Sequence, residues 1–222
     1  MLILSLGVAG CHWPGASRYQ GAGTLELTEH GVGARVAGRL TTLTVDEGQA
    51  VQAGQLLGTL ERHAQAQRDH ERLAALLAQG GATQQAVEQA ALEVEDQTIV
   101  SPVDGVVLVK VHEVGEVVSA AAPVVVIGDR AHLWVRLFVP EGVISRVRQD
   151  QPAAIRFDGI QRSFQGHVSF IAPKAEFTPR NVQTSEERVT QVFAIKVTLD
   201  ETEPWLRPGV AAEVTLDLAG VR

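Results

Sequence analysis

Hydrophobic and polar residues alternate along two stretches of the chain, which predicts half-buried strands. The first covers residues 38–58 and the second residues 105–126. Each reads Gly, nine residues, Gly, two residues, Val, then a small residue and an apolar pair, with one residue inserted late in the second copy. We interpret them as an internal repeat, offset by 67 positions, whose copies fold face to face into one small sandwich.

Between the two copies the apolar spacing changes from two to three or four residues. Residues 62–97 contain no proline and no aromatic residue, and one glycine pair, Gly80–Gly81, lies near their middle. The flanking residues are mainly the strong helix formers Ala, Leu, Gln, Glu and Arg. We therefore expect an antiparallel helical hairpin with an alanine-rich seam, the alternative being an ordinary amphipathic hairpin packed on a core. The expected seam positions are Ala66, Leu73, Leu76, Leu77, Ala86, Val87, Ala90, Ala91 and Val94.

The C-terminal part reads as short strands separated by turns. Residues 23–30 also alternate and predict a strand after a linker, and Pro140 is placed at the first position of a short helix. Strands that close on themselves hide their edges, so we expect a closed or nearly closed β-barrel. The expected strands are 133–139, 153–157, 163–171, 188–198 and 209–217.

The N-terminal residues 1–10 are apolar but too few to span a bilayer, and they suit the core of a secretory signal. Val8-Ala9-Gly10-Cys11 resembles a bacterial lipobox, in which the cysteine receives a diacylglyceryl group. Cys11 is the only cysteine, and this position explains it. No Lys or Arg precedes Cys11, which leaves open a start upstream of Met1. The alternative is an unstructured N-terminus with an unmodified, buried cysteine.

Composition excludes several functions. The formal charge of −7, with no basic cluster among aromatics, argues against nucleic-acid binding. No catalytic set is present, and the seven histidines are not spaced as metal ligands, so we expect neither an enzyme nor a metal site. A lipoyl or biotinyl carrier needs a lysine between its two halves. The lysines are Lys110, Lys174 and Lys196, none at that junction, so no cofactor is expected.

The order of these segments resembles the periplasmic adaptors (membrane fusion proteins) of the HlyD family, in which a hairpin splits a lipoyl-like domain. Ser101-Pro102-Val103-Asp104-Gly105 matches the opening of the second half in that family. Leu206-Arg207-Pro208-Gly209 resembles its turn before the last barrel strand. Residues 177–184 with Arg188 resemble the subgroup that pairs with ABC-type exporters. Asp150 stands where the family usually has glycine.

The resemblance implies a mainly β fold with an inserted α-helical hairpin: a split lipoyl-like (barrel-sandwich hybrid) domain plus a β-barrel domain. The implied segments are a lipoprotein signal (1–10), a linker (11–22), a first lipoyl half with its leading strand (23–61), the hairpin (62–97), a second half (98–129) and the barrel (130–218). A further membrane-proximal domain is expected to be short or absent.

The resemblance also implies a function. The protein is expected in the periplasm as a homo-hexamer, anchored to the inner membrane through the lipid on Cys11. It would link an inner-membrane transporter, ABC type favoured and RND type second, to a TolC-like outer-membrane channel that exports drugs or other small molecules. A carrier or small-molecule-binding β protein and a metal-efflux adaptor stay open as alternatives.

Arg72, Leu76 and Thr83 are the residues expected to dock on the channel. Their spacing resembles the adaptor tip motif Arg-x3-Leu-x6-Ser, with threonine in place of serine. Arginine suits carbonyls or carboxylates, leucine is an apolar anchor, and the hydroxyl lies beside the turn. The alternative is structural: Arg72 is solvated, Leu76 fills the seam, and Thr83 caps the second helix.

Overall fold

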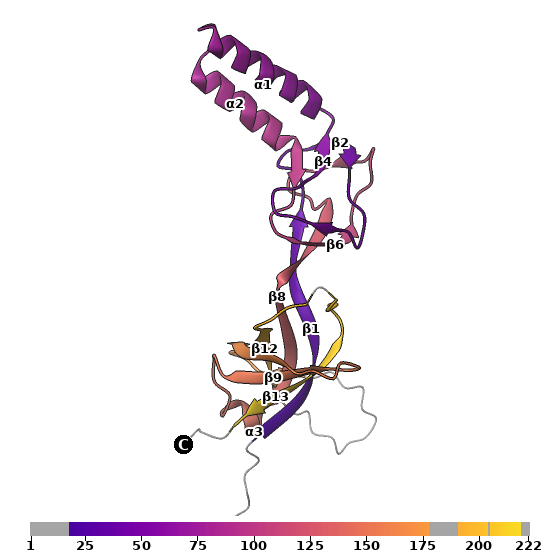
Figure 1. The fold of residues 1–222 in the computed structure, drawn as a ribbon, viewed down its shortest axis with the longest axis vertical. Coiled ribbons are helices and arrows are strands. Elements are labelled where there is room, and N and C mark those ends of the chain that lie inside the picture. The colour runs from indigo at the N-terminus through magenta and orange to yellow at the C-terminus, as the bar shows by residue number, and fades with distance from the viewer. Residues whose placement is uncertain (1–17, 178–190, 204, 219–222) are drawn as a thin grey trace, which may run out of the picture. The chain divides into compact units, whose positions relative to one another are not determined.

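The computed structural model describes residues 18–177, 191–203 and 205–218 (Figure 1). Cys11 and most of the segment 177–184 with Arg188 lie outside these residues. The chain divides into two compact units. The sandwich unit holds residues 27–133 and 202–205, and the barrel unit holds the remainder.

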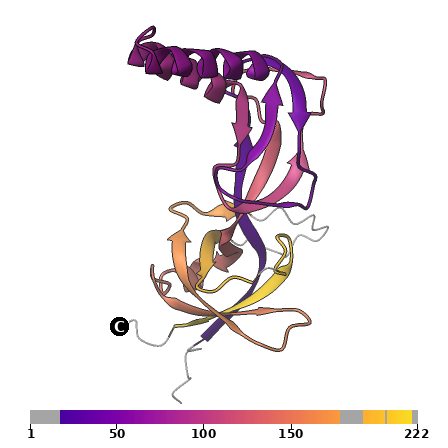
Figure 2. The ribbon, with the colours of Figure 1, turned by 45° about the horizontal axis from the view of Figure 1, so that its top comes forward.

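The barrel unit is a closed ring of six strands, visible in the lower part of Figure 2. Each strand pairs with the next, and β12 also pairs with β8, which closes the ring and leaves no free edge among these six. The ring order is β1 (Arg18–Val32), β13 (Ala211–Asp217), β9 (Pro152–Phe157), β10 (Phe164–Ile171), β12 (Gln191–Leu199) and β8 (Val125–Pro140). The short strand β11 (Glu176–Phe177) pairs with β12, and the helix α3 (Glu141–Ile144) follows β8.

Two local expectations in the barrel unit are wrong. Residues 18–22, expected in a linker, form the start of β1 and pair with β13 from Arg18 to Thr24. The glycines and alanine at the start of β1 have low strand propensity, so the sequence pattern does not indicate a strand there. Tight packing requires glycine at position 23, because a Cβ at Gly23 would lie 2.5 Å from the backbone oxygen of Arg136. Pro140 has extended backbone and is the N-cap of α3, not its first helical residue.

The sandwich unit joins the two repeat copies through exchanged strands. The first copy supplies β2 (Gly38–Leu43), β3 (Ala50–Val51) and β4 (Leu56–Leu60). The second supplies β6 (Gly105–Lys110), β7 (Val117–Val118) and the start of β8. β2 pairs with β7, and β3 pairs with β6, so each copy completes its sheet with a strand of the other.

The register of these pairs repeats at the same offset. Gly38 faces Val118, and Gly105 faces Val51 in the equivalent pair. The four-stranded sheet has the order β5-β4-β2-β7, with β5 covering Thr98–Val100. One hydrophobic core contains buried residues of both copies. The prediction that the two copies fold face to face into one sandwich is therefore confirmed. These core residues are Val32, Ala34, Leu40, Val45, Val51, Leu57, Leu60, Ile99, Val107, Val118, Val124, Val125 and Ile127.

The two copies also turn through the same backbone conformations. Gly48 and Gly115 both have positive φ, at 81° and 99°. Gly54 has a φ of 79°, and its repeat partner Ala121 has a φ of 61°. A left-handed conformation costs a residue with a Cβ about 1–2 kcal/mol, whereas glycine adopts it freely. Ala121 is therefore a strained position that the repeat identifies. Asp150, where the family usually has glycine, also has a φ of 61°.

Substitutions at this repeat-related pair should have opposite effects. Ala121→Gly is expected to raise the free energy of unfolding by about 1 kcal/mol, because it removes the left-handed strain. Gly54→Ala is expected to lower it by a similar amount. Chemical denaturation of the two variants beside the wild type measures both. If Ala121→Gly is destabilising, backbone strain at Ala121 does not contribute significantly to the free energy of unfolding.

The hairpin consists of α1 (His63–Ala78) and α2 (Gln84–Asp96), joined by a turn in which Gly80 has a φ of 75°. The N–H of Gly81 donates to the carbonyl of Leu76 at 2.9 Å and closes the end of α1. Ala66 and Ala90 are buried in the seam, flanked by half-buried residues. These are Leu73, Leu77, Ala86, Val87 and Val94, whereas Leu76 and Ala91 are exposed.

These observations confirm the expected fold class: mainly β, with an α-helical hairpin inserted into a split sandwich and a separate β-barrel. The hairpin leaves the sandwich between β4 and β5, two adjacent strands of the same sheet. Its helices contact one another far more than they contact the sandwich.

Candidate functional site

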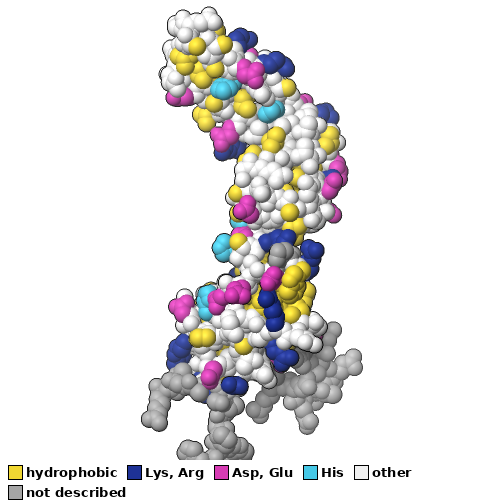
Figure 3. All heavy atoms as spheres, in the orientation of Figure 1, with side chains coloured by type: hydrophobic (Ala, Val, Ile, Leu, Met, Phe, Trp, Pro, Cys, Tyr) yellow, Lys and Arg dark blue, Asp and Glu magenta, His cyan; other side chains and the backbone are white. Residues whose placement is uncertain are grey.

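The hairpin presents Arg72 and Leu76 on one face of α1, since residues four apart lie one turn apart on the same side. The side chain of Arg72 is 67% exposed, and its Nη2 lies 2.6 Å from Oδ1 of Asp69. Leu76 is 39% exposed. Leu77 is half-buried, so Leu76 is the more accessible of the two leucines to a partner. Figure 3 shows hydrophobic side chains on the surface near the end of the hairpin.

Thr83 begins the second helix. Its Oγ1 accepts a hydrogen bond from the backbone N–H of Ala86 at 3.2 Å, so the expected capping role is present. A capping hydroxyl still has its own proton to donate, and the residue is exposed. The structural role therefore leaves Thr83 able to bind a partner through its hydroxyl hydrogen.

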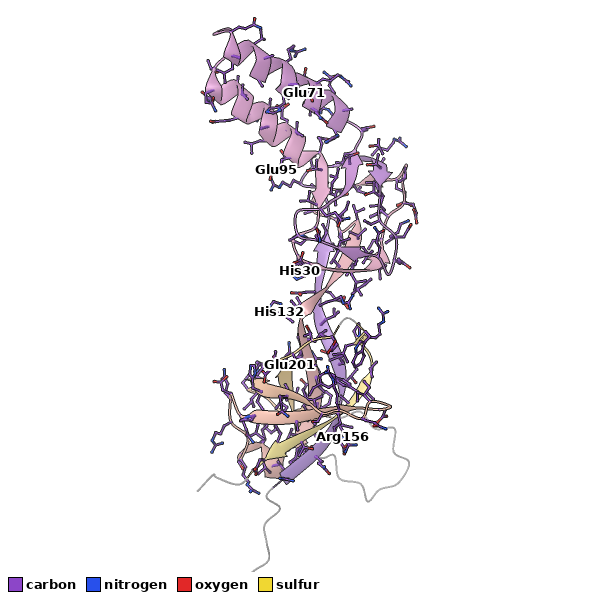
Figure 4. The ribbon with its side chains drawn as sticks, in the orientation of Figure 1. His30, Glu71, Glu95, His132, Arg156 and Glu201 are labelled. Atoms are coloured by element: carbon purple, nitrogen blue, oxygen red, sulfur yellow. The ribbon has the colours of Figure 1, made fainter. Side chains whose placement is uncertain are left out.

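The base of the hairpin is fixed to the sandwich on both sides. The backbone N–H of Leu60 donates to the carbonyl of Gln97 at 2.9 Å, which joins the chain entering and leaving the hairpin. Arg35 Nη2 lies 2.8 Å from Oε1 of Glu95, near the sandwich end of α2 (Figure 4). This exposed ion pair contributes only about 0.2–1 kcal/mol, so the backbone pairing is the main anchor.

The sandwich exposes apolar side chains at opposite edges of its four-stranded sheet. At the β5 edge, Leu56 and Val100 face each other across β4 and β5 and are 45% and 44% exposed. At the other edge, Val117 of β7 is 68% exposed. Further exposed valines lie on and after β6, at Val109, Val111 and Val114. Contiguous exposed apolar side chains mark protein interaction surfaces, and Leu56 and Val100 form such a contiguous pair at the β5 edge.

An ion cluster links the two repeat copies at their turns. Lys110 Nζ lies 3.2 Å from Oδ1 of Asp46 and 3.3 Å from Oε2 of Glu113, and these two hydrogen bonds raise the pKa of Lys110 above its usual value. The backbone N–H of Lys110 donates to Oε1 of Glu47 at 2.9 Å. Glu116 has a lowered pKa because it is hydrogen-bonded to His112, Nδ1 to Oε2 2.7 Å, and to backbone. The lysine is therefore a structural link between the turns.

Asp129 is a buried carboxylate on β8. Its Oδ2 lies 2.7 Å from Nδ1 of His132, which is labelled in Figure 4, and its Oδ1 accepts the backbone N–H of Ala131 at 2.8 Å. Burial alone would raise the pKa of Asp129, but the hydrogen bonds from His132 and from backbone N–H groups outweigh it, so the pKa is lowered. The ionised form of Asp129 therefore stabilises the fold.

The contribution of Asp129 should disappear at low pH. A carboxyl whose folded-state pKa lies below its unfolded-state value stabilises the protein above that unfolded value, about 3.9, and loses this effect as pH falls through the folded-state value. We expect Asp129→Asn to lower the free energy of unfolding by about 1 kcal/mol at pH 7. The difference between the two proteins should shrink steadily as the pH falls below about 3.9. Thermal melts of both proteins across this range give the difference, and a pH-independent gap would contradict the assignment.

The lysines, the metal-ligating side chains and the helices of the described residues bear on carrier, metal and membrane sites. Lys110, Lys174 and Lys196 all lie away from the β4–β5 junction that a carrier lysine would need. Within the described part of the chain, no group of three or more His, Cys, Asp or Glu side chains is placed to hold a metal ion. None of the helices in that part combines the length and apolar character needed to cross a bilayer.

A split sandwich interrupted by a helical hairpin, followed by a closed β-barrel, is the architecture of a membrane fusion protein. Two family models match the chain in agreement with this. The model described as "RND MFP, barrel-sandwich hybrid domain" matches residues 29–128, and the model described as "CusB-like, beta-barrel domain" matches residues 132–220. The chain therefore belongs to the membrane fusion proteins, which are periplasmic adaptors.

Individual curated proteins are also similar to the chain. The chain is 37% identical over 127 residues to the "UPF0194 membrane protein in asrC 5'region" of Acidithiobacillus ferridurans, a match that covers 57% of this chain and 38% of that protein. The chain thus spans about two fifths of the length of the curated relatives it matches.

Solved structures share the fold. A MacA-MexA chimera that carries the α-hairpin domain of Pseudomonas aeruginosa MexA aligns with a TM-score of 0.63 at 22% identity, covering 92% of this chain and 82% of the chimera. The membrane fusion protein Spr0693 of Streptococcus pneumoniae R6 aligns with a TM-score of 0.57 at 17% identity, covering 88% and 97%. At these identities the likeness shows the fold alone.

Proposed function

We propose that the protein is the adaptor subunit that links an inner-membrane transporter to a TolC-like outer-membrane channel for the export of drugs or other small molecules. The hairpin supports this proposal most strongly. Among the described residues the hydrogen bond and ion pair that hold it to the sandwich lie at its base, and it presents Arg72, Leu76 and Thr83 where another protein can reach them. In the proposed arrangement the hairpin contacts the channel and the barrel unit contacts the transporter.

The exposed edges of the sandwich suit a ring of identical subunits. Val100 and Val117 lie on β5 and β7, which are the two outer strands of one sheet. Contact between the β5 edge of one copy and the β7 edge of the next is head-to-tail, and such contacts generate closed rings when the rotation between copies closes. Six copies, as the family resemblance implies, would enclose a conduit. Several weak hairpin contacts would then act together on the channel.

Cysteine cross-linking between the two edges tests the ring. Strands in a sheet lie about 4.8 Å apart, so β5 and β7 of one copy are separated by roughly 14 Å, beyond the reach of a disulfide. In a Cys11→Ser background, the Val100→Cys/Val117→Cys double variant should therefore form a ladder of oligomers with an oxidant or a short bismaleimide. Each single variant serves as the control. A double variant that stays monomeric like the single variants would contradict head-to-tail packing.

The partner and the anchor are finer parts of the proposal. An ABC-type transporter is the proposed partner, because residues 177–184 with Arg188 resemble the subgroup that pairs with ABC-type exporters. An RND-type transporter is the second candidate, because the description of the matched barrel-sandwich model names RND.

Lipid attachment at Cys11 is tested by fractionation, because Cys11→Ser should release the protein from membranes. Unchanged membrane association would count against the lipid.

A further inference from the structure

The barrel unit carries a cavity of about 350 Å³ between β8, β10 and the chain that follows β10. Its walls are largely apolar, and its charged groups are three basic side chains and one acidic side chain. The lining residues are Arg136, Phe170, Ala172, Pro173, Lys174, Glu176, Ala194 and Lys196. A small-molecule site typically has this size and combines apolar walls with a few convergent polar groups.

The register of three adjacent strands produces the hollow. Phe170, Lys196 and Arg136 form one row across β10, β12 and β8, so three long side chains stand side by side. The neighbouring side chains are short: Ala172 directly follows β10 and Ala194 lies on β12, and the backbone N–H of Ala172 donates to the carbonyl of Ala194 at 2.9 Å. The two alanines therefore form the floor of the cavity, and the row of three long side chains forms the wall beside it. The difference in side-chain size produces the hollow.

The charges in that wall are unusual for a purely structural surface. Lys196 and Arg136 face each other directly across β12 and β8, and like charges in this position are destabilising. Glu26 offsets one of them, since its Oε2 lies 3.3 Å from Nε of Arg136. Lys196 Nζ lies 4.3 Å from the ring centroid of Trp134, and no carboxylate among the described residues lies within ion-pair distance of it.

We propose that this cavity is a binding site for an organic monoanion with an aromatic or short aliphatic body. Glu26 pairs with Arg136, and Glu176 is the one acidic side chain of the lining, so the three basic and two acidic groups carry a net charge of +1, which favours one negative charge over two. The planar fork of Arg136 and the ammonium of Lys196 suit a carboxylate, sulfonate or phosphate oxygen pair. Phe170, which is 44% exposed, and Pro173 supply the apolar contact. The site lies wholly in the barrel unit and does not depend on docking by the hairpin.

A matched pair of fluorescent probes tests the chemistry. The first is 8-anilinonaphthalene-1-sulfonate, an aromatic monoanion, and the second is N-phenyl-1-naphthylamine, which has the same aromatic body without the charge. The protein should bind the sulfonate saturably, at one site per chain, and at least tenfold more tightly than the neutral probe. Equal affinity for the two probes would overturn the proposal.

Three substitutions locate the site. Lys196→Gln should weaken binding of the sulfonate about tenfold by removing a charge, and Ala172→Leu should weaken it by filling the floor without changing charge. Arg156→Gln, an equal loss of charge on β9 outside this cavity, should leave binding unchanged. Thermal melts check that each variant is folded. Wild-type affinity in both folded cavity variants would overturn the proposal.

Competition distinguishes a free anion from a lipid. Displacement of the sulfonate probe by benzoate, with no binding to vesicles, identifies a small soluble anion as the occupant. Flotation with phosphatidylglycerol vesicles but not with phosphatidylcholine vesicles, lost in Lys196→Gln, identifies an anionic lipid. Failure of both benzoate and phosphatidylglycerol to compete would contradict an organic-anion site. None of these results depends on a TolC-like partner, so the site and the adaptor function can fail separately.

Discussion

If the proposed adaptor function is right, the protein confers drug tolerance on a sensitised host, and replacing Arg72 or Leu76 with aspartate is expected to abolish that tolerance with no fall in protein level. Arg72→Asp reverses the charge of a side chain that is 67% exposed, and Leu76→Asp removes an exposed apolar anchor. Neither residue is buried in the fold, so folding should be unaffected. Growth in the presence of drug, with immunoblotting for protein level, gives the result.

Arg68 supplies the matched control. It lies one turn before Arg72 on the same face of α1, farther from the tip, and its Nη2 donates to Oε1 of Gln65 at 2.8 Å. Arg68→Asp makes the same charge change outside the proposed contact, so tolerance should be retained. Equal loss of tolerance in both arginine variants would point to general electrostatics. Wild-type tolerance in Arg72→Asp and Leu76→Asp would remove the docking residues from the proposal.

Gly105→Ala should destabilise the sandwich strongly, by about 3 kcal/mol or more, because the new methyl group has no room. A Cβ at Gly105 would lie 2.4 Å from the backbone oxygen of Gly128 and 2.8 Å from a methyl carbon of Ile127. The obstacle is backbone in a paired strand, since Gly105 faces Asp129 across β6 and β8, and it cannot move aside cheaply. Chemical denaturation followed by circular dichroism measures the loss.

The repeat provides a control at Gly38, the equivalent position in the first copy. A Cβ there would lie 3.1 Å from Cδ1 of Leu60, the far end of a flexible side chain that can shift slightly. Gly38→Ala should therefore cost about 1 kcal/mol or less. If both variants are equally stable, the close approach at Gly105 does not limit the fold.

The fold could be predicted from the sequence because its signals are local and repeated. The alternation in residues 38–58 and 105–126, and the glycine pair between two helix-forming arms, each fix one element without knowledge of the others. The left-handed conformation of Ala121 is not evident from an alanine alone. Its alignment with Gly54 in the repeat is the signal that finds it. The start of β1, residues 18–22, gives no strand signal in the sequence because Gly21 is set by close packing, not by strand propensity: a Cβ there would lie 2.9 Å from Cε1 of Tyr19.

The candidate docking residues were predictable as a motif at the end of a hairpin, and the structure adds which of them are exposed. It gives Thr83 a capping role and places Leu77, not Leu76, in the seam. The barrel cavity was not predictable in this way. Phe170, Lys196 and Arg136 are far apart in sequence, and only the strand register brings them into one row.

Photo-cross-linking from position 76 tests the central claim, that this hairpin docks on an outer-membrane channel, most directly. A photoreactive phenylalanine analogue in place of Leu76 should give, in intact cells, a covalent product that contains the channel protein. The same analogue at position 68 should give little or none. Products that contain only other copies of the adaptor, or an equal yield of channel product from both positions, would contradict the account.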